Sequence, residues 1–467
     1  MRRNSRAKNL GLLAVLLAAP LSLPFSGTAA LAQAAAPEPG LPATAPPPVP
    51  PLAPTVPNLH QEEGGRPLVR GESVFDRPRP EYDPIGVRVG GFFLYPRAEL
   101  EETYNDNIFA TKKGTDDFIT VVRPEAALLS NWGQHELNFR VGASIGTFAS
   151  HSSENFADYL ISTDGRYDID HNLSAFGALK FEHLHEDRDD PNSAGVALHP
   201  VEYDAYTGTV GLAQKGLRIG YEASFVIHRE DYENGTAIGG GALDLQVRNL
   251  TSFTPSVRLN YEIVPNYEAF VRATGIFVAY DNSTAGNSAL NPSRDSNGYR
   301  FDAGGRIDLT GVTYAELYAG YLSQEYSDTR LGAISGVDAG ARVVWNPDSI
   351  TSVIFNGDRR VVDANNFAAG GVANSAGYLR SGLSAEVDHE LLRNVLLNAS
   401  VIFENDDYQG IDRSDNRIDL TAGARYLLNN NIYLGAAYTY TNRDSTGAQA
   451  FGQFSRNLFM IRLTGQM

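Results

Sequence analysis

The sequence contains no cysteine among its 467 residues, and it has only three methionines and two tryptophans. A chain without cysteine can form no disulfide, no cysteine metal site and no thiol nucleophile. Basic residues are also in the minority, since 38 Lys and Arg stand against 55 Asp and Glu, which gives a net charge of −17. An acidic chain without a basic patch argues against a nucleic-acid-binding protein.

Long hydrophobic runs are missing as well, except near the N-terminus. Four Lys and Arg residues precede an apolar stretch from Leu10 to Leu23, and Ala30-Leu31-Ala32 then offers small residues for cleavage before Gln33. This order predicts a secretory signal peptide over residues 1–32. The stretch is too short for a membrane-spanning helix, and no later window reaches the ~18 apolar residues that such a helix needs. A membrane protein with this sequence would therefore have to be a closed β-barrel.

Residues 33–80 are rich in proline and alanine and include Pro46-Pro47-Pro48 and Pro50-Pro51. Proline-rich segments of this kind stay extended and bury no core. We expect a disordered periplasmic tether over residues 33–80. A segment that reaches toward peptidoglycan or a periplasmic partner is the alternative.

From residue 92 onward, apolar and polar residues alternate. In the segment 136–147, Leu137 and Phe139 fall on one face, whereas Asn138 and Arg140 fall on the other. Successive side chains of a β-strand point to opposite faces, so this period predicts strands with one apolar and one polar wall. About 18 such strands are expected, at residues 92–105, 118–132, 135–148, 156–168, 172–183, 204–214, 217–231, 247–263, 267–280, 297–309, 313–326, 334–345, 349–362, 377–390, 394–405, 416–428, 432–442 and 456–465.

The connections between these strands alternate in length. Tight turns such as Gly133-Gln134 and Pro265-Asn266 follow the even-numbered strands, and long polar segments such as 184–203 and 443–455 follow most of the odd ones. Short periplasmic turns and long extracellular loops are typical of outer-membrane barrels. We therefore predict an all-β fold, a single transmembrane antiparallel β-barrel of about 18 strands over residues 81–467, with both termini in the periplasm of a Gram-negative bacterium. Aromatic residues near strand ends, including Tyr314, Tyr326, Trp345, Tyr426 and Tyr433, predict girdles at the membrane interfaces.

Two short motifs suggest a family. The entry to the barrel reads Asp83-Pro84-Ile85-Gly86-Val87-Arg88, and the first strand leads into Tyr104-Asn105-Asp106-Asn107-Ile108-Phe109. From about residue 80 to the C-terminus, the chain resembles the outer-membrane β-barrel porin family known as porin type 2, which is common in alphaproteobacteria. The resemblance implies an outer-membrane channel. Some members of that family occur with exopolysaccharide export machinery, so an export conduit is an alternative to a diffusion channel.

Charged residues on the polar faces are the candidate site residues, because a charge facing lipid is costly and these side chains should therefore face the lumen. Arg–Asp pairs that simply brace the wall are the competing interpretation, and both can hold together. The predicted lumen-lining residues are Arg140, Arg218, Glu222, Arg300, Asp302, Arg306, Asp308, Arg342, Arg360, Asp419 and Arg425.

The segment 184–203 is the longest connection and carries Glu186, Asp187, Asp189 and Asp190. By analogy with general porins, this third long loop is a candidate constriction that folds into the barrel and approaches Arg140, Arg218 or Arg300. An extended surface loop, kept outside by its own charge repulsion, is the alternative.

No motif pairs a nucleophile with a base, so we expect no enzyme. No cofactor and no dedicated metal site are expected either, although His183 and His185 stand beside the acidic loop. The sequence predicts a channel for passive diffusion of small hydrophilic solutes. Its expected partners are outer-membrane lipid and lipopolysaccharide, and the barrel-assembly machinery with periplasmic chaperones. A second copy of the chain in a homo-oligomer and polysaccharide export proteins are further candidate partners.

Overall fold

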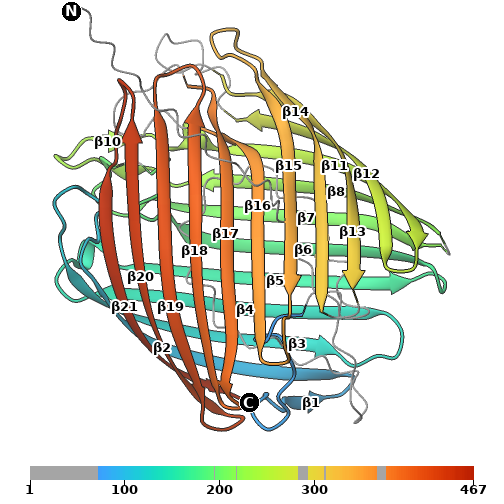
Figure 1. Ribbon diagram of the computed structural model, residues 1–467. Helices are drawn as coiled ribbons and strands as arrows, with labels where there is room; N and C mark the ends of the chain where they lie inside the picture. Colours follow the sequence, from blue (N-terminus) through green and yellow to red (C-terminus); the bar gives the residue numbers. More distant parts are fainter. Residues whose placement is uncertain (1–71, 194, 217, 282–292, 310–311, 365–374) are drawn as a thin grey trace, which may run out of the picture.

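The computed structural model describes residues 72–467, except 194, 217, 282–292, 310–311 and 365–374. Within these ranges the chain forms one closed antiparallel barrel of 18 long strands, which confirms the expected fold (Figure 1). The predicted signal peptide and the tether up to residue 71 lie outside the described residues. Within the described residues, no helix has the length and apolar character to cross a membrane.

The strands of the barrel follow one another in chain order. Their bounds are β2 (Phe92–Asn105), β3 (Asp117–Ser130), β4 (Glu136–Phe148), β5 (Phe156–Asp168), β6 (Leu173–His185), β7 (Glu202–Lys215), β8 (Ile219–Tyr232), β11 (Leu250–Val264), β12 (Tyr267–Tyr280), β13 (Ser296–Leu309), β14 (Thr313–Tyr326), β15 (Ile334–Trp345), β16 (Thr351–Asp363), β17 (Gly377–Leu392), β18 (Val395–Tyr408), β19 (Ser414–Leu427), β20 (Ile432–Thr446) and β21 (Phe454–Gln466). Short elements add β1 (Val87–Val89), which pairs with β2, the hairpin β9 (Gly235–Thr236) and β10 (Ala242–Leu243), and the 3-10 turns η1 (Ser152–Glu154) and η2 (Gln246–Arg248).

Each long strand pairs with the next, and β2 pairs with β21 from Arg97↔Gln466 to Asn105↔Leu458, which closes the barrel. A closed sheet leaves no edge strand with unpaired backbone groups. The pairing of β15 with β16 is short and runs only from Gly340↔Asp358 to Trp345↔Val353. All other neighbours share longer ladders, such as the one between β13 and β14.

The two ends of the barrel differ in their connections. At one end, called here the turn end, short turns join the strands, as between Val264 and Tyr267 and between Leu392 and Val395. At the other end, called the loop end, the connections are long, as between His185 and Glu202. The alternation of short and long connections expected from the sequence is therefore present in space, with one kind at each end.

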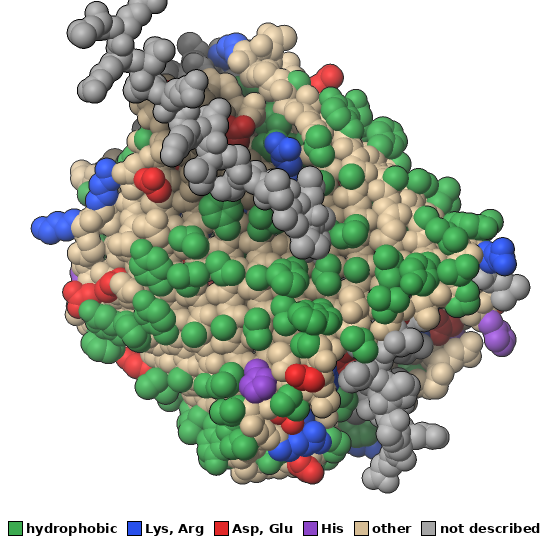
Figure 2. All heavy atoms as spheres, in the orientation of Figure 1, with side chains coloured by type: hydrophobic (Ala, Val, Ile, Leu, Met, Phe, Trp, Pro, Cys, Tyr) green, Lys and Arg blue, Asp and Glu red, His purple; other side chains and the backbone are tan. Residues whose placement is uncertain are grey.

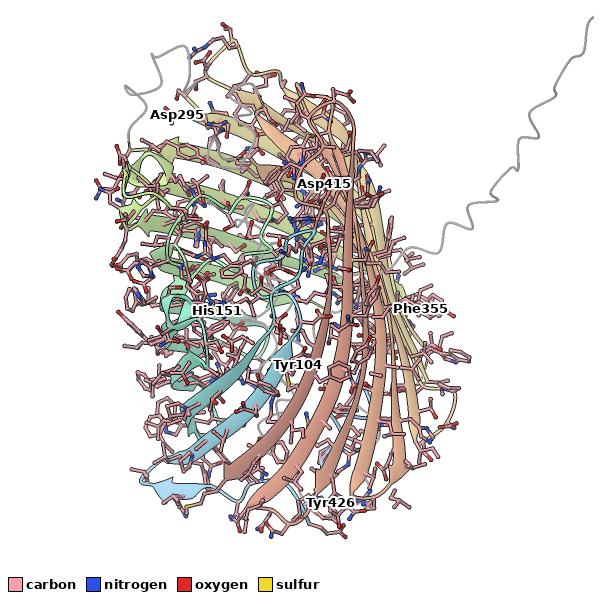
Figure 3. All side chains as sticks on the ribbon, turned by 90° about the vertical axis from the view of Figure 1, so that its left-hand side faces the viewer. Tyr104, His151, Asp295, Phe355, Asp415 and Tyr426 are labelled. Atoms are coloured by element: carbon pink, nitrogen blue, oxygen red, sulfur yellow. The ribbon has the colours of Figure 1, made fainter. Side chains whose placement is uncertain are left out.

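The barrel is apolar outside and polar inside. Leu179, Phe301 and Ile461 are among the large hydrophobic residues that stand exposed on its outer surface. Figure 2 shows hydrophobic side chains spread over this outer wall, with most charged side chains near the rims, and Phe355 points away from the barrel in Figure 3. Buried positions are instead held by charged residues such as Asp338 and Glu230. This distribution, the reverse of that in a soluble protein, suits a wall that contacts lipid.

Aromatic residues near the strand ends divide between the two faces. Trp345 and Tyr426 are exposed on the outer wall, and Tyr426 lies at the turn end in Figure 3. Tyr314, Tyr326 and Tyr433 are buried inside, so the expected girdle is wrong for these three. Side chains alternate between the two faces of a strand, and these tyrosines fall on the same face as inward-facing residues such as Glu316.

Residues 72–83 precede the barrel and dock inside its turn end. Val74 is fully buried and packs against Leu396, Leu427 and Tyr433 of three neighbouring strands. The sequence assigned residues 72–80 to a disordered tether. The structure instead makes this part of the chain a component of the barrel interior.

Candidate pore

Ion pairs between strands cover much of the inner wall. The Arg300 guanidinium donates two hydrogen bonds of 2.7 Å to Asp338 of β15. Arg272 Nε lies 2.9 Å from an Asp302 oxygen, and Arg306 Nη2 lies 2.7 Å from a Glu316 oxygen. Because opposite charges alternate, the wall is hydrophilic without presenting a single sign of charge to the lumen.

Ten of the eleven predicted lumen residues lie on barrel strands. They are Arg140, Glu222, Arg300, Asp302, Arg306, Asp308, Arg342, Arg360, Asp419 and Arg425. The exception is Arg218, which is exposed in the turn before β8, because that strand begins at Ile219. The effect of the ten residues on a passing solute stays a prediction.

Sequence reasoning missed several partners of these residues. Asp338, which receives both hydrogen bonds from Arg300, and Arg272, which pairs with Asp302, were not among the predicted residues. Arg380 and Asp406 form a further buried pair, with Nε 2.7 Å from the carboxylate. Asp338 and Arg272 stand between apolar neighbours, so alternation marks them, whereas Asp406 stands between Asn405 and Asp407 and is not marked in this way.

The connection between β6 and β7, residues 186–201, is called here the inward loop. Asp189 on this loop is fully buried, and its Oδ2 lies 2.9 Å from Arg456 Nη2 and 3.1 Å from Arg417 Nη1. Its backbone oxygen accepts a 2.7 Å hydrogen bond from Arg443 Nη1. These arginines belong to β19, β20 and β21, and β2 to β5 lie between those strands and β6 around the wall. The loop therefore leaves its own side and reaches the wall across the lumen.

Further contacts hold the inward loop along its length. Glu186 pairs with Arg248 of η2, and Arg188 Nε lies 2.7 Å from Glu154 of η1. Asn192 Nδ2 donates a 3.0 Å hydrogen bond to the backbone oxygen of Asp363 at the end of β16. The loop is thus tied to several separate places around the loop end of the barrel.

The two buried carboxyls of the inward loop differ in their ionisation. Burial alone would raise the pKa of Asp189, but Arg456, Arg417 and Arg443 hold it below its ordinary value. Burial and the nearby Glu186 raise the pKa of Asp190 well above its ordinary value. Asp189 is therefore the charged anchor of the loop.

The partners expected for the loop carboxylates were wrong. Arg140 pairs with Asp164 at 2.9 Å, Arg300 pairs with Asp338, and Arg218 lies at the turn end. Asp187 faces its neighbour His185 at 3.6 Å and does not touch the opposite wall. Among the four predicted loop residues, Glu186 and Asp189 make the contacts that hold the loop.

Beside the inward loop, the wall of β8 to β16 is hollowed. Its lining combines polar residues, such as His228, Arg300 and Asp363, with apolar ones such as Ile276 and Leu322. Asp363 is also the residue that accepts the hydrogen bond from Asn192. The hollow therefore lies where the loop meets the wall.

Residues 79–467 match the family described as "Putative beta-barrel porin 2". The chain belongs to this porin family. The resemblance noted in the sequence is thereby confirmed, and the porin is assigned to the outer membrane of Gram-negative bacteria. No curated protein matches its sequence.

Solved structures similar to the porin are themselves barrels. OpdL of Pseudomonas aeruginosa is 9% identical, and the match covers 81% of this chain and 99% of that one with a TM-score of 0.41. OccK2 (OpdF) of the same organism is 8% identical, and the match covers 80% of this chain and 98% of that one with a TM-score of 0.44. A BenF-like porin from Pseudomonas fluorescens Pf-5 is 8% identical, and the match covers 80% of this chain and 99% of that one with a TM-score of 0.43. At this distance the comparison adds nothing about solutes.

The histidines near the inward loop of the porin are engaged by aspartates. His183 Nδ1 lies 2.8 Å from Asp204, and His185 Nδ1 lies 2.8 Å from Asp158. In the part of the chain that the structure describes, no group of three or more His, Asp or Glu side chains is placed to hold a metal ion. Of the acidic residues of the loop, Glu186 and Asp189 form ion pairs with arginine.

Proposed function

We propose that this porin lets small hydrophilic solutes diffuse passively across the outer membrane. The observation that carries the proposal is the bond from Asp189 of the inward loop to Arg417 and Arg456 on the opposite wall. A loop held in that position divides the lumen of a wide barrel and narrows the path through it. In a barrel of about 18 strands, wall side chains alone do not fill the interior, so water and solutes can pass beside the loop.

The charges around this path favour small polar solutes. Paired arginines and carboxylates keep the wall wetted. A loop tied across the lumen is a poor arrangement for the passage of a long polymer. We therefore favour diffusion of small solutes, by a channel without catalytic activity.

Planar-bilayer recording tests the proposal directly. The purified porin should insert in discrete conductance steps that grow with salt concentration, because a water-filled lumen conducts in proportion to its mobile ions. The recording should be made in low and high salt with a detergent-only control. Insertion without any conductance above the lipid background in both salts would refute a diffusion channel.

The orientation of the barrel is part of the same proposal. β2 begins and β21 ends at the turn end, so both ends of the barrel sequence belong there. Short turns face the periplasm and long loops face outward in barrels of this kind. We infer that the turn end is periplasmic and the inward loop enters from outside.

Epitope insertion tests this orientation. A tag between Ala450 and Phe451, in the exposed connection between β20 and β21, should be labelled on intact cells. The same tag after Gly133, in the short turn between β3 and β4, should be labelled only after the outer membrane is permeabilised. Labelling of the Gly133 tag on intact cells would reverse the assignment.

A further inference from the structure

The segment 72–83, called here the cap, covers part of the turn end from within. The Val74 backbone N–H donates a 2.8 Å hydrogen bond to Ser352 Oγ of β16, and Arg79 Nη2 lies 2.8 Å from Glu390 of β17. Gln466 Nε2 of β21 donates to the Tyr82 backbone oxygen at 3.1 Å. The cap therefore extends along the inner wall from β16 to β21.

Arg425 of β19 lies beneath this cap and is only 3% exposed. Its guanidinium carbon lies 5.0 Å from the Phe75 ring centre and 5.3 Å from that of Tyr433. Its Nε and Nη2 are buried without a hydrogen-bond partner, and no carboxylate of the described residues is among the charges that act most on it. Cation–π contacts offset only part of the cost of burying a guanidinium without an anion.

Other cationic groups surround Arg425. Three further arginines, Arg97, Arg462 and Arg79, lie close enough for their positive charges to act on it. Each of the three has one buried nitrogen without a partner: Nε of Arg97, Nη1 of Arg462 and Nε of Arg79. The nearby carboxylates are already engaged, since Arg462 pairs with Glu99 and Glu101, and Arg79 pairs with Glu390. The cluster holds donors in excess of acceptors.

The strand register places a buried residue without a side chain, Gly435, between Arg425 and Arg462. Arg425 is paired with Gly435 of β20, and Gly435 is paired with Arg462 of β21. Neighbouring strands are about 4.8 Å apart, so the two arginines start about 10 Å apart on either side of a residue without a side chain. Two long guanidinium side chains can converge over that glycine on one small anion.

We propose that Arg425, Arg462 and the floor at Gly435 form a binding site for a small oxyanion, a carboxylate or a phosphate, and that the cap competes for it. The planar guanidinium fork matches the two oxygens of such an anion. Phe75 covers Arg425, so an anion binds fully only when Phe75 moves aside. The apparent affinity for the anion is therefore proportional to the fraction of molecules in which Phe75 has moved aside. The site lies on the proposed diffusion path, and its role as a solute site rests on that function.

Nuclear magnetic resonance line widths of two probes test the site without any need for conduction. Trifluoroacetate is followed by its fluorine signal and inorganic phosphate by its phosphorus signal, with the detergent-solubilised full chain at constant ionic strength in chloride. We expect the wild-type porin to broaden at least one signal. The ion that shows the broadening identifies the class, and saturation by the unlabelled ion gives the affinity.

Three variants give the expected directions. Arg425→Gln should weaken binding at least about tenfold, because hydrogen bonds between charged groups contribute that much. Gly435→Val should also weaken it by filling the floor without changing the charge. Phe75→Ala should strengthen it, because the cap no longer covers the guanidinium. Arg330→Gln, at an exposed position of the loop end, removes one positive charge far from the site and should change nothing.

The same broadening in wild type and Arg425→Gln would overturn the proposal, and so would the absence of any broadening in Phe75→Ala. All variants are first checked for folding by their mobility in unheated gels. A porin that binds the probe through Arg425 but shows no conductance would refute the diffusion channel and leave the site intact. Conductance without Arg425-dependent binding would refute the anion site and leave the diffusion channel intact.

Discussion

Replacing Asp189 with alanine should increase the single-channel conductance of the porin. The substitution removes the carboxylate that joins the inward loop to Arg417 and Arg456; Arg456 loses its ion-pair partner, whereas Arg417 keeps Asp419. Breaking a buried ion pair by removing one partner costs about 3–5 kcal/mol. That loss shifts the balance between held and released loop by two orders of magnitude or more, at roughly 1.4 kcal/mol for each factor of ten. A released loop obstructs the lumen less, and the recorded steps should be larger and more variable.

Asp187→Asn is the matched control, because it removes the same charge from the same loop at a residue that makes no contact with the opposite wall. Its conductance should stay close to that of the wild type. Deletion of residues 186–196 should raise conductance at least as far as Asp189→Ala. If neither the deletion nor Asp189→Ala changes the step size in low and high salt, the inward loop does not limit the path.

Replacing Leu179 with lysine should prevent most of the porin from reaching its folded form in the outer membrane. Leu179 lies near the middle of β6 and is 64% exposed on the outer wall. A lysine at the bilayer midplane of a barrel wall costs about 2–4 kcal/mol. The measurement is the fraction of porin in the outer-membrane preparation that runs as a folded, heat-modifiable band.

Ala178→Lys places the same charge one residue earlier, on the face that alternates with Leu179 and carries Lys180. This control should fold normally, because an inward-facing ammonium group remains in contact with water and with the carboxylates of the wall. Equal folding of the two variants would show that the facing assigned to β6 is incorrect.

The strands were predictable because their signal is local. Residues 92–105, 156–168, 267–280, 313–326 and 334–345 were expected as strands, and β2, β5, β12, β14 and β15 have those same bounds. The period of two needs no knowledge of distant residues, since side chains of each strand alternate between lipid and lumen. The pattern places the ends of a strand less well than its middle. The strand expected from residue 217 begins at Ile219, so Arg218 lies in a turn and not on the predicted wall.

The contacts across the lumen were not predictable in the same way. Asp189 and Arg456 are 267 residues apart, and Val74 and Ser352 are 278 residues apart. No periodic pattern shows which wall a loop will reach once the sheet has closed. The cap was missed for a related reason, since a proline-rich segment without its own core becomes ordered only when the assembled barrel offers it the pocket formed by Leu396, Leu427 and Tyr433.

The ladder between β2 and β21 has a consequence for how quickly the barrel can form. Leu100 is paired with Leu463, so the last bonds to form join residues more than 360 positions apart. Contacts of such long sequence separation are slow, because the entropy of closing a long loop is lost before the contact returns any energy. Until β21 has arrived, β2 keeps one open edge that could pair with another chain. The time between export of β2 and arrival of β21 is therefore the interval in which the unfinished sheet is most exposed to aggregation.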